Sequence, residues 1–275
     1  MSYTLEQGKL YRMPTHFGPS LGPRQGPDDR RFEVRESSKQ RTLTARFAVS
    51  GGQFEPFLPP GFSVQSETIL SISYTEITEI EWLAGRGYNT LGVTLGARCT
   101  GATEVVDGDF LMVLWENMCD PIITGREELG FSKIFCDLPP LRIMPDSIAA
   151  EASWDSHIFA RIRAEGGHAI DPTELPASDS SGLLHYKYLP RTGAPGEADV
   201  AYPTLTPAAA PNLKVEKATR FDAAEVTFLK SSWEQLPTLV HIVNALAAID
   251  LGESLGATLV ETRGYKDLSD QRIVG

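Results

Sequence analysis

Short runs of alternating and β-branched residues, separated by glycine and proline clusters, constrain the fold of this chain more than any other feature. Four of them follow one another in the first half: RTLTARFAV, TILSISYTEI, LGVTLGARC and DFLMVLWE. Successive side chains of a strand point to opposite faces, so such runs are typical of half-buried strands. The second half continues the pattern in AEASWDSHIFARIRA, GLLHYKYLP, LKVEKATRF and AEVTFLK. This series predicts a mainly β fold, either a sandwich or a closed barrel.

Two segments have the pattern of helices. Residues 120–130 begin with Asp120 as a possible N-cap, continue with a proline and end at a glycine. Residues 231–252 place leucine and valine on one helical face and end at Gly252. Because strands and helices do not alternate along the chain, a doubly wound parallel sheet is not expected.

The N-terminal 40 residues differ from the rest of the chain. Their PTHFGPSLGPRQGPDDR stretch is dense in proline and glycine, which predicts an extended arm over the surface. No linker divides residues 41–275, so we expect them to form one domain with long polar loops within 171–200.

Composition limits the partners of this chain. Twenty-five Lys and Arg residues against 36 Asp and Glu residues give a net charge of −11, which argues against nucleic acid and anionic membranes. No apolar run reaches the length of about 18 residues that spans a bilayer, and the N-terminus lacks the layout of a signal peptide. We therefore expect a cytoplasmic protein. The three cysteines and five histidines match no metal-binding spacing, and no glycine-rich phosphate loop occurs, so we expect neither a metal nor a cofactor.

One segment suggests chemistry. In TGREELGFSKIF, Thr124 to Phe135, Lys133 is the only charged residue of the run from Leu129 to Cys136. Most lysines lie on solvated faces, but a lone amine among apolar groups is open to desolvation. A desolvated amine loses its proton more readily and becomes a nucleophile toward carbonyl groups.

The motif GREELGFSK resembles the active-site signature of the acetoacetate decarboxylase superfamily. FEPFLPPGFSV, GRGYNTLG, DGDFLMVLWEN and EVTFLKSSWEQLPTLVHIVNALAAIDL resemble further segments of that family, in order, over residues 40–265. The family's Schiff-base lysine falls on Lys133, and the family is itself the standard example of such a lysine. The resemblance implies a curved antiparallel sheet that closes into a barrel-like cone, a few peripheral helices and a homo-oligomer.

The resemblance also implies a substrate pocket around Lys133. We expect its contacts to come from Glu76, Tyr88, Thr90, Arg126 and Phe131, although the pattern around Glu76 alone is typical of a solvated strand edge.

The chain departs from the family pattern at four places. Ile134 replaces the second lysine of the signature, Ser132 replaces the proline, and Thr90 replaces a glutamate two residues after the pocket tyrosine. The family arginine aligns with either Gln40 or Arg41. Because no second ammonium lies beside Lys133, desolvation alone must favour its neutral amine, so its pocket must exclude water more fully than in other members of the family.

A protonated imine stabilises a carbanion however that carbanion arises, so the lysine alone does not select the reaction. We expect a Schiff-base-forming carbon–carbon lyase that acts on a keto acid or keto-containing metabolite of secondary metabolism, with decarboxylation first. Two alternatives stay open: an aldolase–dehydratase on keto acids, and a non-catalytic barrel that binds a small ligand.

Overall fold

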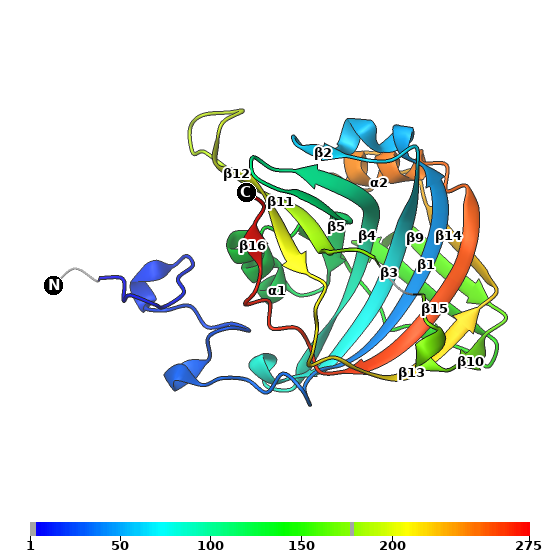
Figure 1. The fold of residues 1–275 in the computed structure, drawn as a ribbon, viewed down its shortest axis with the longest axis horizontal. Helices are drawn as coiled ribbons and strands as arrows, with labels where there is room; N and C mark the ends of the chain where they lie inside the picture. The colour runs from blue at the N-terminus through cyan, green and yellow to red at the C-terminus, as the bar shows by residue number, and fades with distance from the viewer. Residues whose placement is uncertain (1–3, 177–178) are drawn as a thin grey trace.

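Two β-sheets form the body of the protein in the computed structural model, which describes residues 4–176 and 179–275. Within these residues, one sheet has twelve strands and the other has four. Figure 1 shows the long strands of the larger sheet side by side in one curved surface. The prediction of a mainly β fold is confirmed.

The larger sheet runs in the order β10-β13-β15-β1-β3-β4-β5-β11-β12-β16, with β2 paired to β4 and β6 paired to β5. Its bounds are β1 Lys39–Ser50, β2 Phe62–Ser63, β3 Glu67–Ile80, β4 Arg86–Thr100, β5 Val105–Glu116, β6 Lys133–Phe135, β10 His168–Ile170, β11 Gly182–Pro190, β12 Ala198–Pro207, β13 Lys214–Phe221, β15 Glu253–Arg263 and β16 Arg272–Ile273. The smaller sheet contains β7 Arg142–Ile143, β8 Ser147–Trp154, β9 His157–Glu165 and β14 Ala223–Phe228.

The central strands of the larger sheet have two chemically different faces. One face carries buried apolar side chains, such as Leu43 on β1, Ile72 on β3 and Val93 on β4. The other face carries hydroxyl groups, and Thr44 of β1 and Ser73 of β3 approach within 2.9 Å. Strict alternation along each strand therefore separates an apolar face from a polar face.

The apolar face packs against the smaller sheet and forms the main core. Trp115 of β5 lies at its centre, with ring centroids 5.4 Å from Phe159 and 6.2 Å from Phe228. The helix α2, Val240–Ala247, adds Val243 and Leu246 to the same cluster.

The expected closure into a barrel-like cone is wrong. In the part of the chain that the structure describes, β10 and β16 end the larger sheet without pairing to each other. The sheet is also not purely antiparallel, because β5 pairs in parallel with both β6 and β11. The curved sheet instead leaves its polar face open at one side.

The helices are shorter than the pattern predicts. Helix α1, Cys119–Thr124, continues as a π-helical turn, Gly125–Leu129, so a helical segment exists as expected. Its N-cap is Met118 rather than Asp120, because Asp120 already lies inside the first turn. The second helix covers only 240–247 of the predicted 231–252, since Pro237 disfavours helical geometry in the residue before it. Short 3-10 turns lie at Thr15–Phe17, Pro27–Asp29, Gly51–Phe57, Glu81–Leu83 and Pro172–Glu174.

Residues 4–38 lie outside both sheets. Figure 1 shows this N-terminal segment on the side of the body where α1 lies, and its Arg12 donates to the Thr124 hydroxyl. Its division from a domain at 41–275 stays a prediction. No helix in the described ranges is long and apolar enough to cross a membrane.

Candidate active site

Lys133 begins the three-residue strand β6 and pairs with Leu114 of β5. Gly130, at φ +84°, turns the chain from the π-helical turn toward this strand. The lysine is only 9% exposed. Its Nζ donates a hydrogen bond to the Pro121 carbonyl at 3.1 Å and lies 2.9 Å from Oε1 of Glu116. The amine is therefore buried and held in one place.

Gly125 makes room for this amine. A Cβ at this position would lie 2.6 Å from both Cδ and Cε of Lys133 and 2.9 Å from its Nζ. Only glycine lets the helical turn approach the lysine so closely, which explains the first residue of the GREELG motif.

Glu116 is the acidic partner of Lys133. It is 1% exposed and lies directly opposite Thr90 across the β4–β5 pairing. Burial raises the pKa of the Glu116 carboxyl, and the charge of Lys133 opposes that rise only in part. Its Oε2 is buried and has no hydrogen-bond partner among the described residues. The carboxyl can therefore take up a proton and has one oxygen free for a reacting group.

Two rings enclose the other side of the amine. The Phe131 ring centroid lies 5.2 Å from Nζ of Lys133 and 4.1 Å from the ring of His185. His185 Nε2 lies 2.9 Å from the Thr206 hydroxyl, whereas Nδ1 is buried without a partner in the described part of the chain. Burial lowers the pKa of His185 to about 3, and the charge of Lys133 acts in the same direction. The imidazole is therefore neutral at physiological pH.

Tyr88 and Thr90 lie on the Lys133 face of β4. Alternation places both on the side of Glu116, which pairs with Thr90. Burial raises the pKa of the Tyr88 phenol, and the charge of Glu116 adds to the rise. The structure thus brings Tyr88, Thr90 and Phe131 to the lysine.

Glu76 lies on the other face of the larger sheet. It shares the apolar face of β3 with Tyr74, accepts a hydrogen bond from the Leu141 amide at 2.7 Å and pairs with Arg41 at 2.5 Å. The structure does not bring Glu76 to Lys133, because the β-sheet backbone separates them.

Arg126 touches the lysine only through the backbone. Its Nη1 donates to the Lys133 carbonyl at 2.8 Å, and the residue is exposed. The guanidinium thus fixes the outer edge of β6. Ile134 also points away from the amine, since it packs against the main core on the opposite face of β6. A lysine in the place of Ile134 would not face Lys133.

A family model for acetoacetate decarboxylase (ADC) matches residues 12–261. The chain belongs to the acetoacetate decarboxylase family. The resemblance of the GREELGFSK signature is therefore confirmed, and the family match begins inside the N-terminal segment.

Solved structures share the fold of this family member. Acetoacetate decarboxylase from Legionella pneumophila subsp. pneumophila str. Philadelphia 1 has a TM-score of 0.64 at 16% identity, over 90% of this chain and 92% of that chain. An acetoacetate decarboxylase-like enzyme from Sphingomonas wittichii RW1 has a TM-score of 0.61 at 14% identity, over 89% and 92%. The enduracididine biosynthesis enzyme MppR, complexed with the condensation product of pyruvate and imidazole 4-carboxaldehyde, has a TM-score of 0.60 at 13% identity, over 86% and 87%. No curated protein matches the sequence.

Sequence reasoning missed the acidic partner in this acetoacetate decarboxylase family member. It expected uniformly apolar surroundings for Lys133, whereas the structure places Glu116 beside the amine. A signal was present, because Glu116 ends the apolar run FLMVLW as its first charged residue, much as Lys133 is the lone charge of its own run. His185 and Gly125 were also missed as site residues. Among the described residues, no group of three or more His, Cys, Asp or Glu side chains is placed to hold a metal ion.

Proposed function

We propose that this protein is a carbon–carbon lyase that forms a Schiff base between Lys133 and a keto acid. The observation that supports it is the buried amine of Lys133, held 2.9 Å from a carboxyl whose pKa is raised by burial. A carboxyl of raised pKa can accept the ammonium proton and leave the amine free for attack.

The proposed sequence uses Glu116 to carry protons. The neutral amine bonds to the keto carbon, and the carbonyl oxygen takes one proton from the amine nitrogen and a second from Glu116. Water then leaves to give a protonated imine. For a β-keto acid, the bond to the carboxyl carbon then breaks, carbon dioxide leaves, and the electron pair moves through the new double bond to the imine nitrogen. Glu116, which has taken up a new proton from solvent water, donates that proton to the resulting enamine carbon. Water then hydrolyses the imine, which releases the ketone and restores the amine. Phe131 and His185 limit the access of water to these steps.

A second reaction, aldol condensation with dehydration, is favoured by the free oxygen of Glu116. Oε2 is buried and unpartnered within the described residues, so it can accept a proton from the carbon next to the imine. Removal of that proton gives an enamine that keeps its carboxylate, without loss of carbon dioxide. The enamine then attacks an aldehyde, and loss of water completes the condensation.

Borohydride reduction tests the Schiff base. Protein incubated with acetoacetate or pyruvate and borohydride should gain a secondary amine at Lys133, located by tryptic mass spectrometry. Lys133→Ala should abolish the adduct. Lys187→Ala is the matched control, because Lys187 is a half-buried lysine that donates to the Glu128 carbonyl instead. An unmodified Lys133 in folded protein would refute the proposal in favour of a ligand-binding protein.

Two products separate the reactions. Carbon dioxide released from acetoacetate indicates decarboxylation. Deuterium incorporated into the pyruvate methyl group in heavy water, without release of carbon dioxide, indicates the aldol route.

A further inference from the structure

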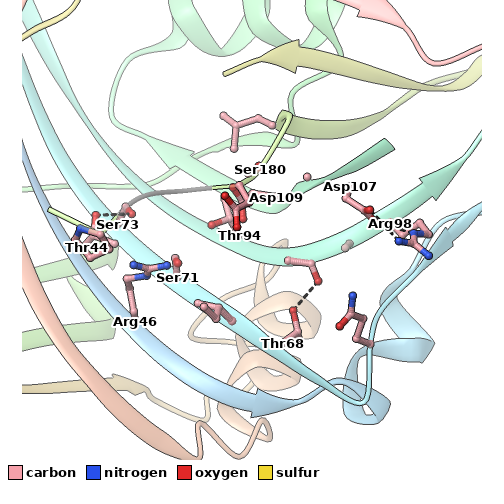
Figure 2. Close-up of a pocket in the computed structure, with 18 of the residues that line it drawn as sticks. Thr44, Arg46, Thr68, Ser71, Ser73, Thr94, Arg98, Asp107, Asp109 and Ser180 are labelled. Carbon is pink, nitrogen blue, oxygen red and sulfur yellow. Dashed lines mark hydrogen bonds and ion pairs between the residues drawn. The ribbon is translucent and has the colours of Figure 1, made fainter. Parts of the chain in front are cut away.

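A cavity of about 760 Å³ lies on the polar face of the larger sheet. Figure 2 shows its floor, where hydroxyl groups from neighbouring strands point into the space. Four of these hydroxyls belong to Thr44, Ser71, Ser73 and Thr94, and Thr258 also lines the cavity. All five residues are half-buried where they line this cavity.

This cavity and Lys133 share one face of the sheet. Thr94, Gly92 and Thr90 follow one another on that face of β4, Gly92 pairs with Leu114, and Leu114 pairs with Lys133. Two strand spacings and two residues along a strand separate the Cα atoms of Thr94 and Lys133 by about 12 Å. The lysine side chain covers part of that separation.

Two leucines lie between the cavity and the lysine. A Cβ on Gly92 would meet Cδ1 of Leu114 at 3.1 Å and Cδ1 of Leu111 at 3.9 Å. Leu111 is 3% exposed, but it belongs neither to the main core around Trp115 nor to the smaller apolar cluster that contains Phe62 and Phe110. The leucines therefore cover the floor between the hydroxyls and the amine with flexible apolar side chains.

The charges of the cavity fit a ligand rich in hydroxyl groups. Arg98 and Asp107 neutralise each other through two hydrogen bonds of 2.7 and 2.8 Å. Arg46 and Asp109 each line the cavity half-buried, with no ion-pair partner in residues 4–176 and 179–275. Glu67 and Asp179 add exposed carboxylates at its edge. The guanidinium and carboxylate groups without ion-pair partners, together with the hydroxyls, can donate to and accept from sugar-like hydroxyls.

The excess of acidic side chains around the cavity disfavours a ligand group that carries several negative charges. Glu67, Asp109 and Asp179 outnumber Arg46 once the Arg98–Asp107 pair is set aside. In the described part of the chain, no aromatic side chain lines the cavity, which also disfavours an aromatic tail. The hydrogen-bonding groups that line the cavity therefore match a neutral ligand group with several hydroxyls.

We propose that the cavity binds the hydroxylated tail of the substrate, so that the substrate is a sugar-derived keto acid whose keto group reaches Lys133 past Leu111 and Leu114. This inference rests on the Schiff-base function proposed above. A site built to hydrogen-bond hydroxyls rejects an analogue that lacks them, because its own polar groups then lose water without gaining partners.

Two keto acids of equal carbon number test the preference, 2-keto-3-deoxygluconate and 2-ketohexanoate. Borohydride trapping at Lys133 should reach half-saturation at a concentration at least about tenfold lower for the hydroxylated acid. Thr94→Val, which keeps side-chain size and removes the hydroxyl, should reduce this preference. Thr42→Val is the matched control, because Thr42 carries its hydroxyl on the same face of the sheet, in β1, but does not line the cavity. Equal trapping of the two acids, or a preference unchanged by Thr94→Val, would overturn the inference and leave the Schiff base intact.

Gluconate provides a measurement that does not depend on the Schiff base, since it has no keto group. Calorimetry with Lys133→Ala should detect gluconate binding, and Thr94→Val in that background should weaken it. If no keto acid labels Lys133 but gluconate binds, the Schiff-base function fails while the hydroxyl-binding cavity stands. If gluconate does not bind, the cavity proposal is wrong.

Discussion

In the proposed Schiff-base function, Glu116 is the group that takes up the amine proton of Lys133. We expect Glu116→Gln to slow Schiff-base formation about a hundredfold, because an amide keeps the shape of the side chain but cannot take up the amine proton. The rate of borohydride-trapped adduct at pH 7 measures this. Glu76→Gln is the matched control, since Glu76 is an equally buried glutamate on the opposite face of the sheet. A normal trapping rate in folded Glu116→Gln would assign the pair to structure alone.

His185 makes stability depend on pH. Its pKa in the folded protein is about 3, below the value of about 6.5 in an unfolded chain. Below pH 6.5 the unfolded chain therefore binds a proton that the folded protein refuses, and stability falls as the pH drops from about 6.5 toward 3. The free energy of unfolding should fall between pH 7 and pH 4.5 by about 2 kcal/mol less in His185→Gln than in the unmodified protein. Urea unfolding at the two pH values measures this difference.

His168→Gln serves as the control for this measurement, because His168 is exposed. It should leave the pH dependence as in the unmodified protein. The same acid sensitivity in His185→Gln as in the parent would show that other groups cause it.

The residues that sequence reasoning could find are those with a local signal. Lys133 stands out because its whole neighbourhood along the chain is apolar. The partnership of Glu116 with Lys133 depends on a parallel pairing of β5 with β6, and no local pattern encodes that register. Glu76 was misplaced for the same reason, since only the register with its neighbours tells which face of a strand meets the site.

At the scale of the element, the turn from α1 into β6 positions the amine. Gly125→Ala should place a methyl group 2.6 Å from the Lys133 side chain and push the amine out of line with Glu116. We expect trapping at Lys133 to fall by about tenfold or more, while circular dichroism stays that of a β protein.

Gly52→Ala is the control for this substitution. A Cβ there meets nothing within 4 Å, so trapping should be unchanged. Undiminished trapping in Gly125→Ala would show that the turn does not fix the lysine.

The strands could be predicted because alternation is a local pattern. Whether the two end strands of the sheet pair with each other could not be predicted from such a pattern. The runs around β1, β3, β4 and β5 were identified from their period alone. Closure depends on whether β10 meets β16, which are separated by about a hundred residues and carry little apolar patterning. The expected cone came from the resemblance, and the curvature was confirmed without the closure.

At the scale of the whole molecule, the N-terminal segment is tied to the signature turn. Arg12 and Arg24 both form ion pairs with Glu128, whose side chain is only 12% exposed. Arg12 also donates to the Thr124 hydroxyl. Removal of one charge from a buried cluster leaves the others unpaired, which is costly. The homo-oligomer and the cytoplasmic location stay predictions.

Glu128→Gln should therefore loosen the N-terminal segment without unfolding the sheets. Trypsin should cut after Arg12 and Arg24 about tenfold faster, which corresponds to about 1.4 kcal/mol in the opening equilibrium. Glu127→Gln is the neighbouring control, because the structure gives Glu127 no ion pair within the described residues. Unaltered cleavage in Glu128→Gln would show that other contacts hold the segment.

The two-faced strands of the larger sheet have a consequence for how this protein can change over evolutionary time. Residues 43, 72 and 93 sustain folding, while their immediate neighbours 44, 73 and 94 face the cavity. Selection can therefore act on ligand preference one residue away from the core with little loss of stability. A combinatorial library confined to the cavity positions of β1, β3 and β4 should consequently retain a high fraction of folded members. Under the proposed Schiff-base function, it offers a direct way to redirect Lys133 toward other carbonyl compounds.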